Sequence, residues 1–476
     1  MQTKRLFKFA IMMLTLMASS QYFIVGRGSI LMMPAVLVVY VIMTFILKTK
    51  GDYTLNIMIA YSMSHFHLAT KAGMLGPWLI LAYLMMNGRI FIDGKYFKYN
   101  SLLIIQIIIF LVLNLLGLIV KNPNTLFENM TSFISLIGLL VTLVVVSNYE
   151  FNKNDIKFVI LIFIIMTAYT LLSAINTSLG LIYTTSPLFS LNEVYFGSHW
   201  GVPMFGRSCS EYFLCMNIFF AYLLTTQIDV LFGIKRHIIL LAYIISFVGC
   251  IIGFSKTMTT ILIISNAVIL VRNIISIDIK KTINIITGLG VLVIILIMIR
   301  NFLNIDYIFE RFNEQPEIFK RVYENPLTAE GTSRDYSFYW GWRRNLDYSW
   351  FLGYGWSPAD ANNAAYFHNL PINISKHDFH NLYLSIFPVF GWIGGGIFLW
   401  WLLSLLIKSL RMSRMKNLYI KTIGSAFFGL SIVFLLGEYA IPITSEANYM
   451  FILFVWMGMV NSLYNTSKQV KLNYHY

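Results

Sequence analysis

The sequence predicts an all-α polytopic membrane protein, with about 12–14 transmembrane helices and one large outward-facing loop that contains interfacial helices. Composition supports this fold class, because 58% of the 476 residues are hydrophobic and only 12% are charged, whereas soluble domains carry about 25% charged residues. Apolar runs of about 20 residues, long enough to cross the hydrocarbon core as a helix, recur from end to end. The runs are continuous rather than alternating, so they predict helices and not a β-barrel.

Each apolar run predicts one span. The weakest runs are the third and the fourth, and either one is compatible with a short or re-entrant helix, so twelve spans remain an alternative to fourteen. The first run follows Lys4, Arg5 and Lys8 and continues to Val25, which favours a retained span over a signal peptide. We therefore treat residues 1–476 as a single integral membrane domain. The expected spans are residues 7–25, 30–47, 54–70, 73–87, 102–120, 126–147, 156–179, 209–228, 237–254, 257–275, 282–300, 381–407, 418–438 and 447–464.

The distribution of Lys and Arg predicts the orientation of the chain. With the N-terminus inside, the inner segments hold 22 of the 35 basic residues, and the short outer loops hold four. Basic residues gather on the cytoplasmic side of membrane proteins, so both termini are predicted in the cytoplasm. The net charge of +14 then reflects insertion and anionic lipid rather than nucleic acid. Two longer segments face outward, the smaller at 180–208 and the larger, periplasmic or extracellular, at 301–380.

The larger outer segment contains two expected interfacial helices. Residues 305–323 mix apolar and charged side chains at helical spacing, which is typical of a helix lying on the membrane surface. Residues 333–352 are rich in aromatic side chains, among them Tyr336, and Trp356 follows shortly after. Amphipathic rings settle in the headgroup layer, and they also stack on sugar faces. Both interpretations of these aromatic residues stay open.

Four short motifs between residues 200 and 400 carry a resemblance to a known family. They are Gly206-Arg207-Ser208, Gly253-Phe254-Ser255-Lys256-Thr257, Ser333-Arg334 followed by Gly353-Tyr354-Gly355-Trp356, and His380-Asn381-Leu382-Tyr383-Leu384 followed by Gly391 and Gly394. In order, spacing and side of the membrane, this set resembles the O-antigen ligase and polymerase superfamily of bacterial inner-membrane glycosyltransferases. Lys256 stands where that family usually has arginine.

The resemblance implies glycosyl transfer from an undecaprenyl-pyrophosphate-linked glycan at the outer face, without metal, cofactor or nucleotide sugar. The basic residues suit that chemistry, because a departing lipid pyrophosphate is an anion that fixed cations stabilise, and guanidinium offers a bidentate fork. Arg207, Lys256 and Arg334 are expected at the outer ends of spans or in the loop above them, so that they can converge. We assign Arg207 and Arg334 to catalysis and Lys256 to substrate binding.

His380 is the expected general base for the acceptor hydroxyl, because the unperturbed imidazole pKa is about 6.5. Asn381, Trp356, Tyr336 and Glu211 complete the expected substrate contacts. Glu211 also stands four residues after Arg207, a spacing at which the two side chains pair on a helix. Cys209, Cys215 and Cys250 fall within expected spans and predict neither disulfides nor a metal site.

Three functions compete. The first is a repeat-unit polymerase for O-antigen, capsule or exopolysaccharide, in which donor and acceptor are both lipid-linked. The second is an O-antigen ligase, whose acceptor is a lipid A-core sugar of lipopolysaccharide. The third is a flippase for lipid-linked oligosaccharide, but it predicts two similar halves and polar residues along the midplane, and neither is evident in the sequence. We favour the polymerase, with membrane lipids and a chain-length regulator and flippase of the same pathway as expected partners.

Labelling of introduced cysteines in intact cells tests the predicted orientation. Substitutions Ser198→Cys and Asn363→Cys lie in the outward segments, whereas Lys235→Cys and Lys416→Cys lie in inner loops. A membrane-impermeant maleimide should modify only the first pair until the cells are permeabilised. Modification of the second pair in intact cells would reverse the orientation and remove the predicted site from the outer face.

Overall fold

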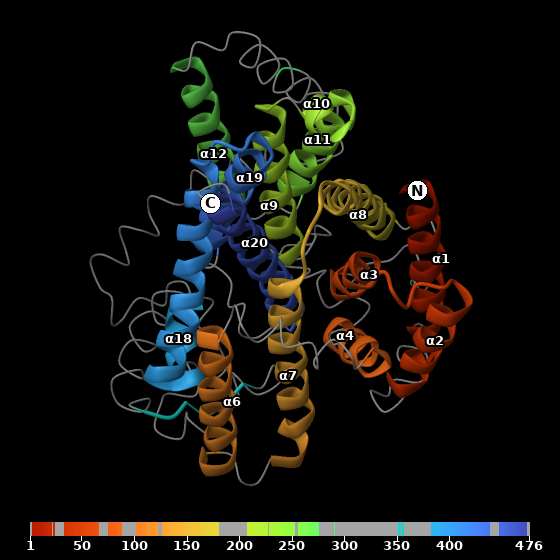
Figure 1. The fold of residues 1–476 in the computed structure, drawn as a ribbon, viewed down its shortest axis with the longest axis vertical. Helices are drawn as coiled ribbons and strands as arrows, with labels where there is room; N and C mark the ends of the chain where they lie inside the picture. The colour runs from red at the N-terminus through yellow and green to blue at the C-terminus, as the bar shows by residue number, and fades with distance from the viewer. Residues whose placement is uncertain are drawn as a thin grey trace.

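The protein is helical throughout the part of the chain that its computed structural model describes. These residues are 2–20, 22–23, 33–65, 75–87, 101–121, 126–179, 207–226, 228–252, 256–275, 290, 351–353, 355–356, 382–437 and 447–473, and they contain no strand. The helices in Figure 1 are α1 (Gln2–Ser20), α2 (Met33–Ile46), α3 (Tyr53–His65), α4 (Leu75–Met86), α6 (Ser101–Lys121), α7 (Leu126–Asn148), α8 (Lys153–Leu179), α9 (Arg207–Leu224), α10 (Ile228–Phe232), α11 (Arg236–Ile252), α12 (Lys256–Ile275), α18 (Leu382–Ser413), α19 (Leu418–Gly437) and α20 (Ala447–Asn473).

The predicted fold class is confirmed. Each helix except α10 coincides with an expected span, and the span expected at 282–300 lies outside the described residues apart from Gly290. The sequence does not predict α10, because five residues are too few to show a period. Both expected interfacial helices fall outside the described residues, except that Phe351 and Leu352, at the end of the second, are not helical.

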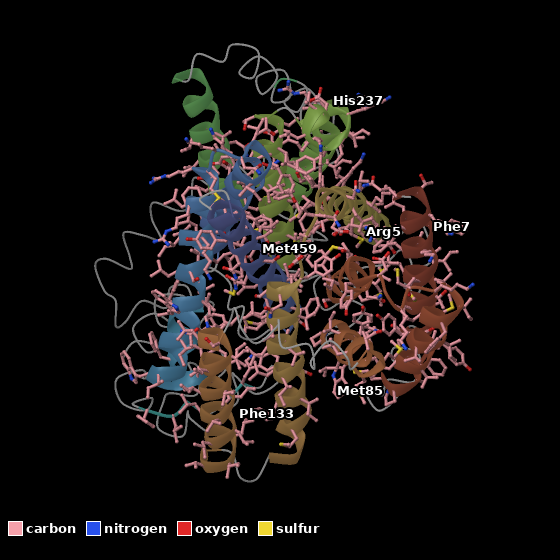
Figure 2. All side chains as sticks on the ribbon, in the orientation of Figure 1. Arg5, Phe7, Met85, Phe133, His237 and Met459 are labelled. Carbon is pink, nitrogen blue, oxygen red and sulfur yellow. The ribbon has the colours of Figure 1, made fainter. Side chains whose placement is uncertain are left out.

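Four of the described helices are long and apolar enough to cross a membrane. They lie at Ser101–Val120, Lys153–Leu172, Val389–Ser413 and Leu418–Gly437, with mean hydropathy between 1.8 and 3.0. Shorter apolar helices accompany them in α2, α4, α7, α9, α11 and α12. The chain is therefore a polytopic membrane protein. The surface of the protein is consistent with a membrane environment, because large apolar side chains are exposed on it. Phe7 and Met85, labelled in Figure 2, are 65% and 86% exposed.

The third and fourth helices are short. α3 has 13 residues and α4 has 12, which gives lengths of about 20 Å and 18 Å, less than the ~30 Å hydrocarbon core. α3 is buried from Thr54 to Ser64 and packs against α1, α4, α8 and α20. A helix with no lipid-facing side can carry buried polar residues, such as Asn56, when they are hydrogen-bonded. This position in the core explains the weak hydropathy of the third run.

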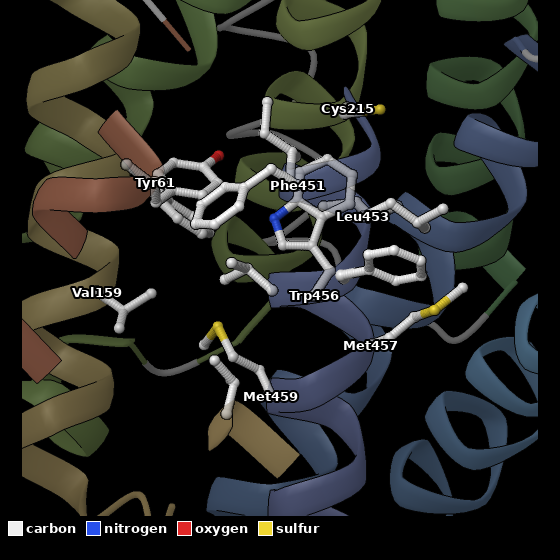
Figure 3. Close-up of a cluster of buried hydrophobic side chains, with 14 of the residues drawn as sticks. Tyr61, Val159, Cys215, Phe451, Leu453, Trp456, Met457 and Met459 are labelled. Atoms are coloured by element: carbon white, nitrogen blue, oxygen red, sulfur yellow. The ribbon is translucent and has the colours of Figure 1, made fainter. Parts of the chain in front are cut away.

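The core is centred on α20, which is buried at every residue from Met450 to Val460. It packs against α7, α18 and α3. Figure 3 shows Trp456 of α20 in one cluster with Tyr61 of α3, Val159 of α8 and Cys215 of α9. Segments far apart in the sequence thus share one apolar interior.

Glycines bring several helix pairs into close contact. A methyl group added to Gly458 of α20 would lie 2.6 Å from Val146 Cβ and 3.2 Å from the backbone nitrogen of Ser147, both at the end of α7. An added methyl at Gly138 of α7 would lie 2.9 Å from Pro77 Cβ of α4. Lipid supplies no hydrophobic force between helices, so small residues that let backbones approach are the usual basis of packing.

Charged residues join the chain segments that the sequence places in the cytoplasm. Arg5 donates hydrogen bonds to Asp52 and Asp155, both at 2.9 Å, and the Tyr149 hydroxyl donates to Asp155 at 3.0 Å. Burial lowers the pKa of Arg5, but its bonds to Asp155 and Asp52 outweigh that effect, so the pKa is raised overall. Burial raises the pKa of Tyr149 to about 12. Lys157 donates to the carbonyl of Gly233. The N-terminal segment and three loops expected on one side are therefore joined by these contacts, while their assignment to the cytoplasm stays a prediction.

A glycine exchange tests the helix packing. Gly458→Ala places a methyl group against Val146 and should lower the free energy of unfolding by about 1–3 kcal/mol, the usual cost of overpacking. Gly396→Ala is the matched control, because Gly396 is exposed on α18 with no atom within 4 Å of the added methyl; it should stabilise the helix by about 0.5–1 kcal/mol. Thermal unfolding in detergent should separate the two variants, and equal midpoints would contradict the proposed contact.

Candidate functional site

Three helices begin against the last turn of α19. A methyl group added to Gly437, the last residue of α19, would lie 3.0 Å from Glu211 Oε1 of α9 and 3.5 Å from Met258 Cε of α12. The Tyr383 hydroxyl, in the first turn of α18, donates a 2.7 Å hydrogen bond to the carbonyl of Leu435. The N-terminal parts of α9, α12 and α18 therefore all contact the C-terminal end of α19.

The meeting of these N-termini favours negative charge. The aligned peptide dipoles of a helix leave a partial positive charge of about half a unit at its N-terminus. Backbone N–H groups in the first turn have no partner within the helix and point toward an anion that binds there. The three N-termini bring partial positive charge to the last turn of α19, whose own C-terminus carries partial negative charge. Basic residues open two of the three helices and add positive charge, since Arg207 begins α9 and Lys256 begins α12.

Glu211 is a carboxylate buried in this region. Its side chain is 1% exposed, and an ionised carboxylate without compensating charge is costly to remove from water. The N-terminal end of α12 lies nearby, since Met258 approaches the same point as Glu211, and the partial positive charge at a helix N-terminus reduces the cost of a buried carboxylate. Arg207 stands four residues before Glu211, so both positions lie on one face of α9. Glu211 is thus held at the level where the helix ends converge.

The structure brings some of the predicted site positions together. Arg207, Glu211 and Lys256 all belong to helix starts at the last turn of α19, although the side chains of Arg207 and Lys256 lie outside the described residues. Asn381 directly precedes α18, and it is also outside the described part. The same applies to His380, Arg334 and Tyr336. The roles assigned to these residues stay predictions.

Trp356 lies elsewhere, in a short piece of the predicted large outer loop that is inserted between α6 and α18. The backbone nitrogen of Trp356 donates to Asn114 Oδ1 of α6 at 3.1 Å. The backbone nitrogen of Gly355 donates to the carbonyl of Val389 in α18 at 3.0 Å. Asn114 is 1% exposed and stands seven residues before the end of α6, about 10 Å along the helix axis. We call residues 351–353 and 355–356 the anchor segment.

Glycines make room for the anchor segment. A methyl group at Gly117 of α6 would collide with the carbonyl oxygen of Gly353, and one at Gly353 would collide with the backbone of Val389 and Gly391. Gly391 has φ of 72° and kinks α18, while Gly355 has φ of 84°; both values lie in the region that favours glycine. Non-helical backbone at membrane depth is tolerated only when protein satisfies its polar groups, as Asn114 and Val389 do here.

Burial of Trp356 bears on its expected role. The side chain is 0% exposed, so in this conformation no face of the indole ring is open for stacking on a sugar. The described contacts support a structural role for Trp356, and sugar binding by this residue stays a prediction. Sequence reasoning missed Asn114, although an amide within an apolar span is a recognised sign of an interior contact.

No protein-family model matches the chain, and no curated protein matches it significantly. Among the residues that the structure describes, no group of three or more His, Cys, Asp or Glu side chains is placed to hold a metal ion. Cys215 and Cys250 are both buried, at 1% and 0% exposed, as small apolar side chains commonly are. The arrangement of helix ends is thus the main structural indication of a site.

Hydrogen exchange tests the anchor segment. Gly117→Val should force residues 351–356 away from α6, because the added side chain meets the backbone of Gly353 and Gly355. Overpacking of about 1–3 kcal/mol should accelerate exchange of the Gly355 and Trp356 amides about tenfold or more, measured by mass spectrometry on peptides that cover them. Leu116→Val is the control, because Leu116 is 42% exposed on α6. Equal protection in both variants would show that Gly117 does not hold the segment.

Proposed function

We propose that the protein is a polysaccharide repeat-unit polymerase, a membrane glycosyltransferase that works at the outer face of the bacterial cytoplasmic membrane. Its donor is a glycan linked to undecaprenyl pyrophosphate, and its acceptor is a sugar hydroxyl of a second lipid-linked glycan. The observation that carries the proposal is the meeting of the α9, α12 and α18 N-termini on the last turn of α19. The products suit O-antigen, capsule or exopolysaccharide synthesis.

The pyrophosphate is the group that this arrangement suits. As the bond between the anomeric carbon and the pyrophosphate oxygen breaks, negative charge grows on the leaving lipid pyrophosphate. Helix N-termini and fixed cations stabilise such charge best when they are already in place before reaction. Arg207 and Lys256 open two of the three helices, and Arg334 belongs to the outer loop. The bidentate guanidinium of Arg207 and Arg334 and the point charge of Lys256 would share the two phosphate groups.

The acceptor side of the reaction needs a base. The acceptor oxygen forms a bond to the anomeric carbon and gives up its proton, which His380 takes; the electron pair of the broken bond leaves with undecaprenyl pyrophosphate. General-base catalysis of this kind contributes about 10²–10⁴-fold. His380 stands two residues before α18, whose first turn contacts α19. Asn381 would orient substrate beside it, and Glu211 would balance the cationic groups.

A defined reaction tests the proposal. Purified protein in EDTA, given one undecaprenyl-pyrophosphate-linked repeat unit, should build a ladder of polymers on a gel. Loss of the base should lower the rate by about 10²–10⁴-fold in His380→Ala. Arg207→Ala and Arg334→Ala should lower it by about 10²–10³-fold, the usual effect of losing one stabilising group, and Arg→Lys should restore little. Lys256→Arg should be tolerated.

The controls separate the proposed function from its alternatives. Lys235→Ala removes an exposed cation from the opposite end of α9–α11 and should leave the ladder unchanged. A ladder of normal rate in both arginine variants would remove support for pyrophosphate binding by these residues. Product that forms only after lipid A-core is added would identify an O-antigen ligase. Movement of the intact lipid across vesicles without any transfer would identify a flippase.

A further inference from the structure

A network of buried polar side chains joins α9, α11 and α12 in the interior of the helical bundle, further along α9 and α12 than the candidate site. Asn266 Nδ2 of α12 donates to Asn217 Oδ1 of α9 at 2.9 Å, and the Tyr243 hydroxyl of α11 donates to Asn266 Oδ1 at 3.0 Å. Asn217 Nδ2 donates in turn to the carbonyl of Tyr243 at 3.0 Å and to Ser246 Oγ at 3.4 Å. All four residues are at most 4% exposed.

Every hydrogen-bonding group of the two amides has a partner. Each Nδ2 donates twice, because Asn266 Nδ2 also reaches the carbonyl of Leu262 at 2.8 Å, and each Oδ1 accepts once. A buried polar network that is fully satisfied rigidifies its surroundings and specifies one arrangement. A shift of α12 against α9 by one residue would leave several of these groups unpaired in an apolar interior, which is costly. The network therefore fixes the register between the two helices.

The register places the two cationic helix starts at equal height. Asn217 is ten residues after Arg207, and Asn266 is ten residues after Lys256. Ten residues of α-helix extend about 15 Å, so a direct bond between Asn217 and Asn266 in helices that run the same way puts Arg207 and Lys256 at one level. Glu211 and Met258, about one turn or less further along their helices, both approach Gly437, which agrees with that alignment.

We propose that Asn217, Tyr243 and Asn266 are positioning residues, which hold the starts of α9 and α12 at the separation that one pyrophosphate spans. This inference deepens the proposed function and rests on it for the identity of the ligand. The three residues lie too deep to touch the pyrophosphate, so they act through the helices. A point charge and a bidentate fork on two separate helices bind one diphosphate only if both helices keep their register.

Two measurements test the proposal in the full-length protein. The first is the Kd for undecaprenyl pyrophosphate, titrated against folded protein in detergent. The second is the distance between spin labels at Ser208→Cys and Thr257→Cys, beside the two cations, measured by pulsed EPR after the native cysteines are replaced by alanine. Asn266→Leu removes the hydrogen bond between α9 and α12. Tyr243→Phe removes only the hydroxyl of Tyr243 and keeps the hydrogen bond between Asn217 and Asn266.

The matched control is Asn56→Leu in α3. Asn56 is a buried amide that accepts from the Tyr40 hydroxyl at 2.6 Å and donates to the carbonyls of Thr49 and Asp52 at 2.8 Å. Its loss therefore damages a similar network away from the candidate site. A general loss of stability would lower the number of binding sites in all variants and leave the Kd of the folded fraction unchanged.

We expect Asn266→Leu to shift or broaden the EPR distance and to raise the Kd about tenfold, since displacement of about 1 Å at a charged site has large effects. Tyr243→Phe should show a smaller change in the same direction, and Asn56→Leu should change neither quantity. An unchanged EPR distance in Asn266→Leu overturns the positioning role. A parent protein that binds no undecaprenyl pyrophosphate overturns the proposed function instead, and the EPR distances then decide the register alone.

Discussion

Hydrocarbon offers no hydrogen-bond partner, and this constraint decides where the polar groups inside the helical bundle can lie. Asn56 meets the Tyr40 hydroxyl between α3 and α2, Asn114 meets the Trp356 backbone between α6 and the anchor segment, and Asn266 meets Asn217 between α12 and α9. Each amide is buried and joins two different elements, which are consecutive for Asn56 and far apart in the sequence for Asn114 and Asn266. Buried amides therefore specify which parts of the chain become neighbours, a task that uniform apolar packing does not perform.

Glycines set how closely those neighbours approach. Helices associate in lipid through close packing, and a missing side chain lets two backbones touch. Gly458 does this between α20 and α7, and Gly117 does it between α6 and the anchor segment. In the second case the neighbour is irregular backbone, so the space left by glycine and the acceptor supplied by Asn114 are both required. Without the glycine, a side chain of α6 would collide with the backbone of Gly353. Without Asn114, the backbone N–H of Trp356 would lose its acceptor.

The sequence predicted the parts of the fold that depend on local properties. Apolar runs locate the helices, because the length of a span follows from the thickness of the bilayer. The alternation of spans also predicted that Arg207 and Lys256 stand at the same ends of their helices, which agrees with the contacts of α9 and α12 at Gly437. Arg334, the third cation predicted to converge with them, lies outside the described residues. The kink at Gly391 could not be predicted, since a glycine is tolerated inside a straight membrane helix. The contact of Asn114 with Trp356 spans 242 positions of the chain, and no local pattern encodes such a pair.

α18 connects the anchor segment with the meeting point of the helix ends. Its Tyr383 bonds to the last turn of α19, and its Val389 accepts from Gly355 of the anchor segment. Six residues of helix separate these two contacts, about 9 Å. The chain that leaves Trp356 and re-enters at Leu382, residues 357–381, is thus attached at both ends to the first turns of one helix. The two described ends of this stretch are thus fixed by contacts of α18 with the anchor segment and with α19, while a role for His380 beside them stays a prediction.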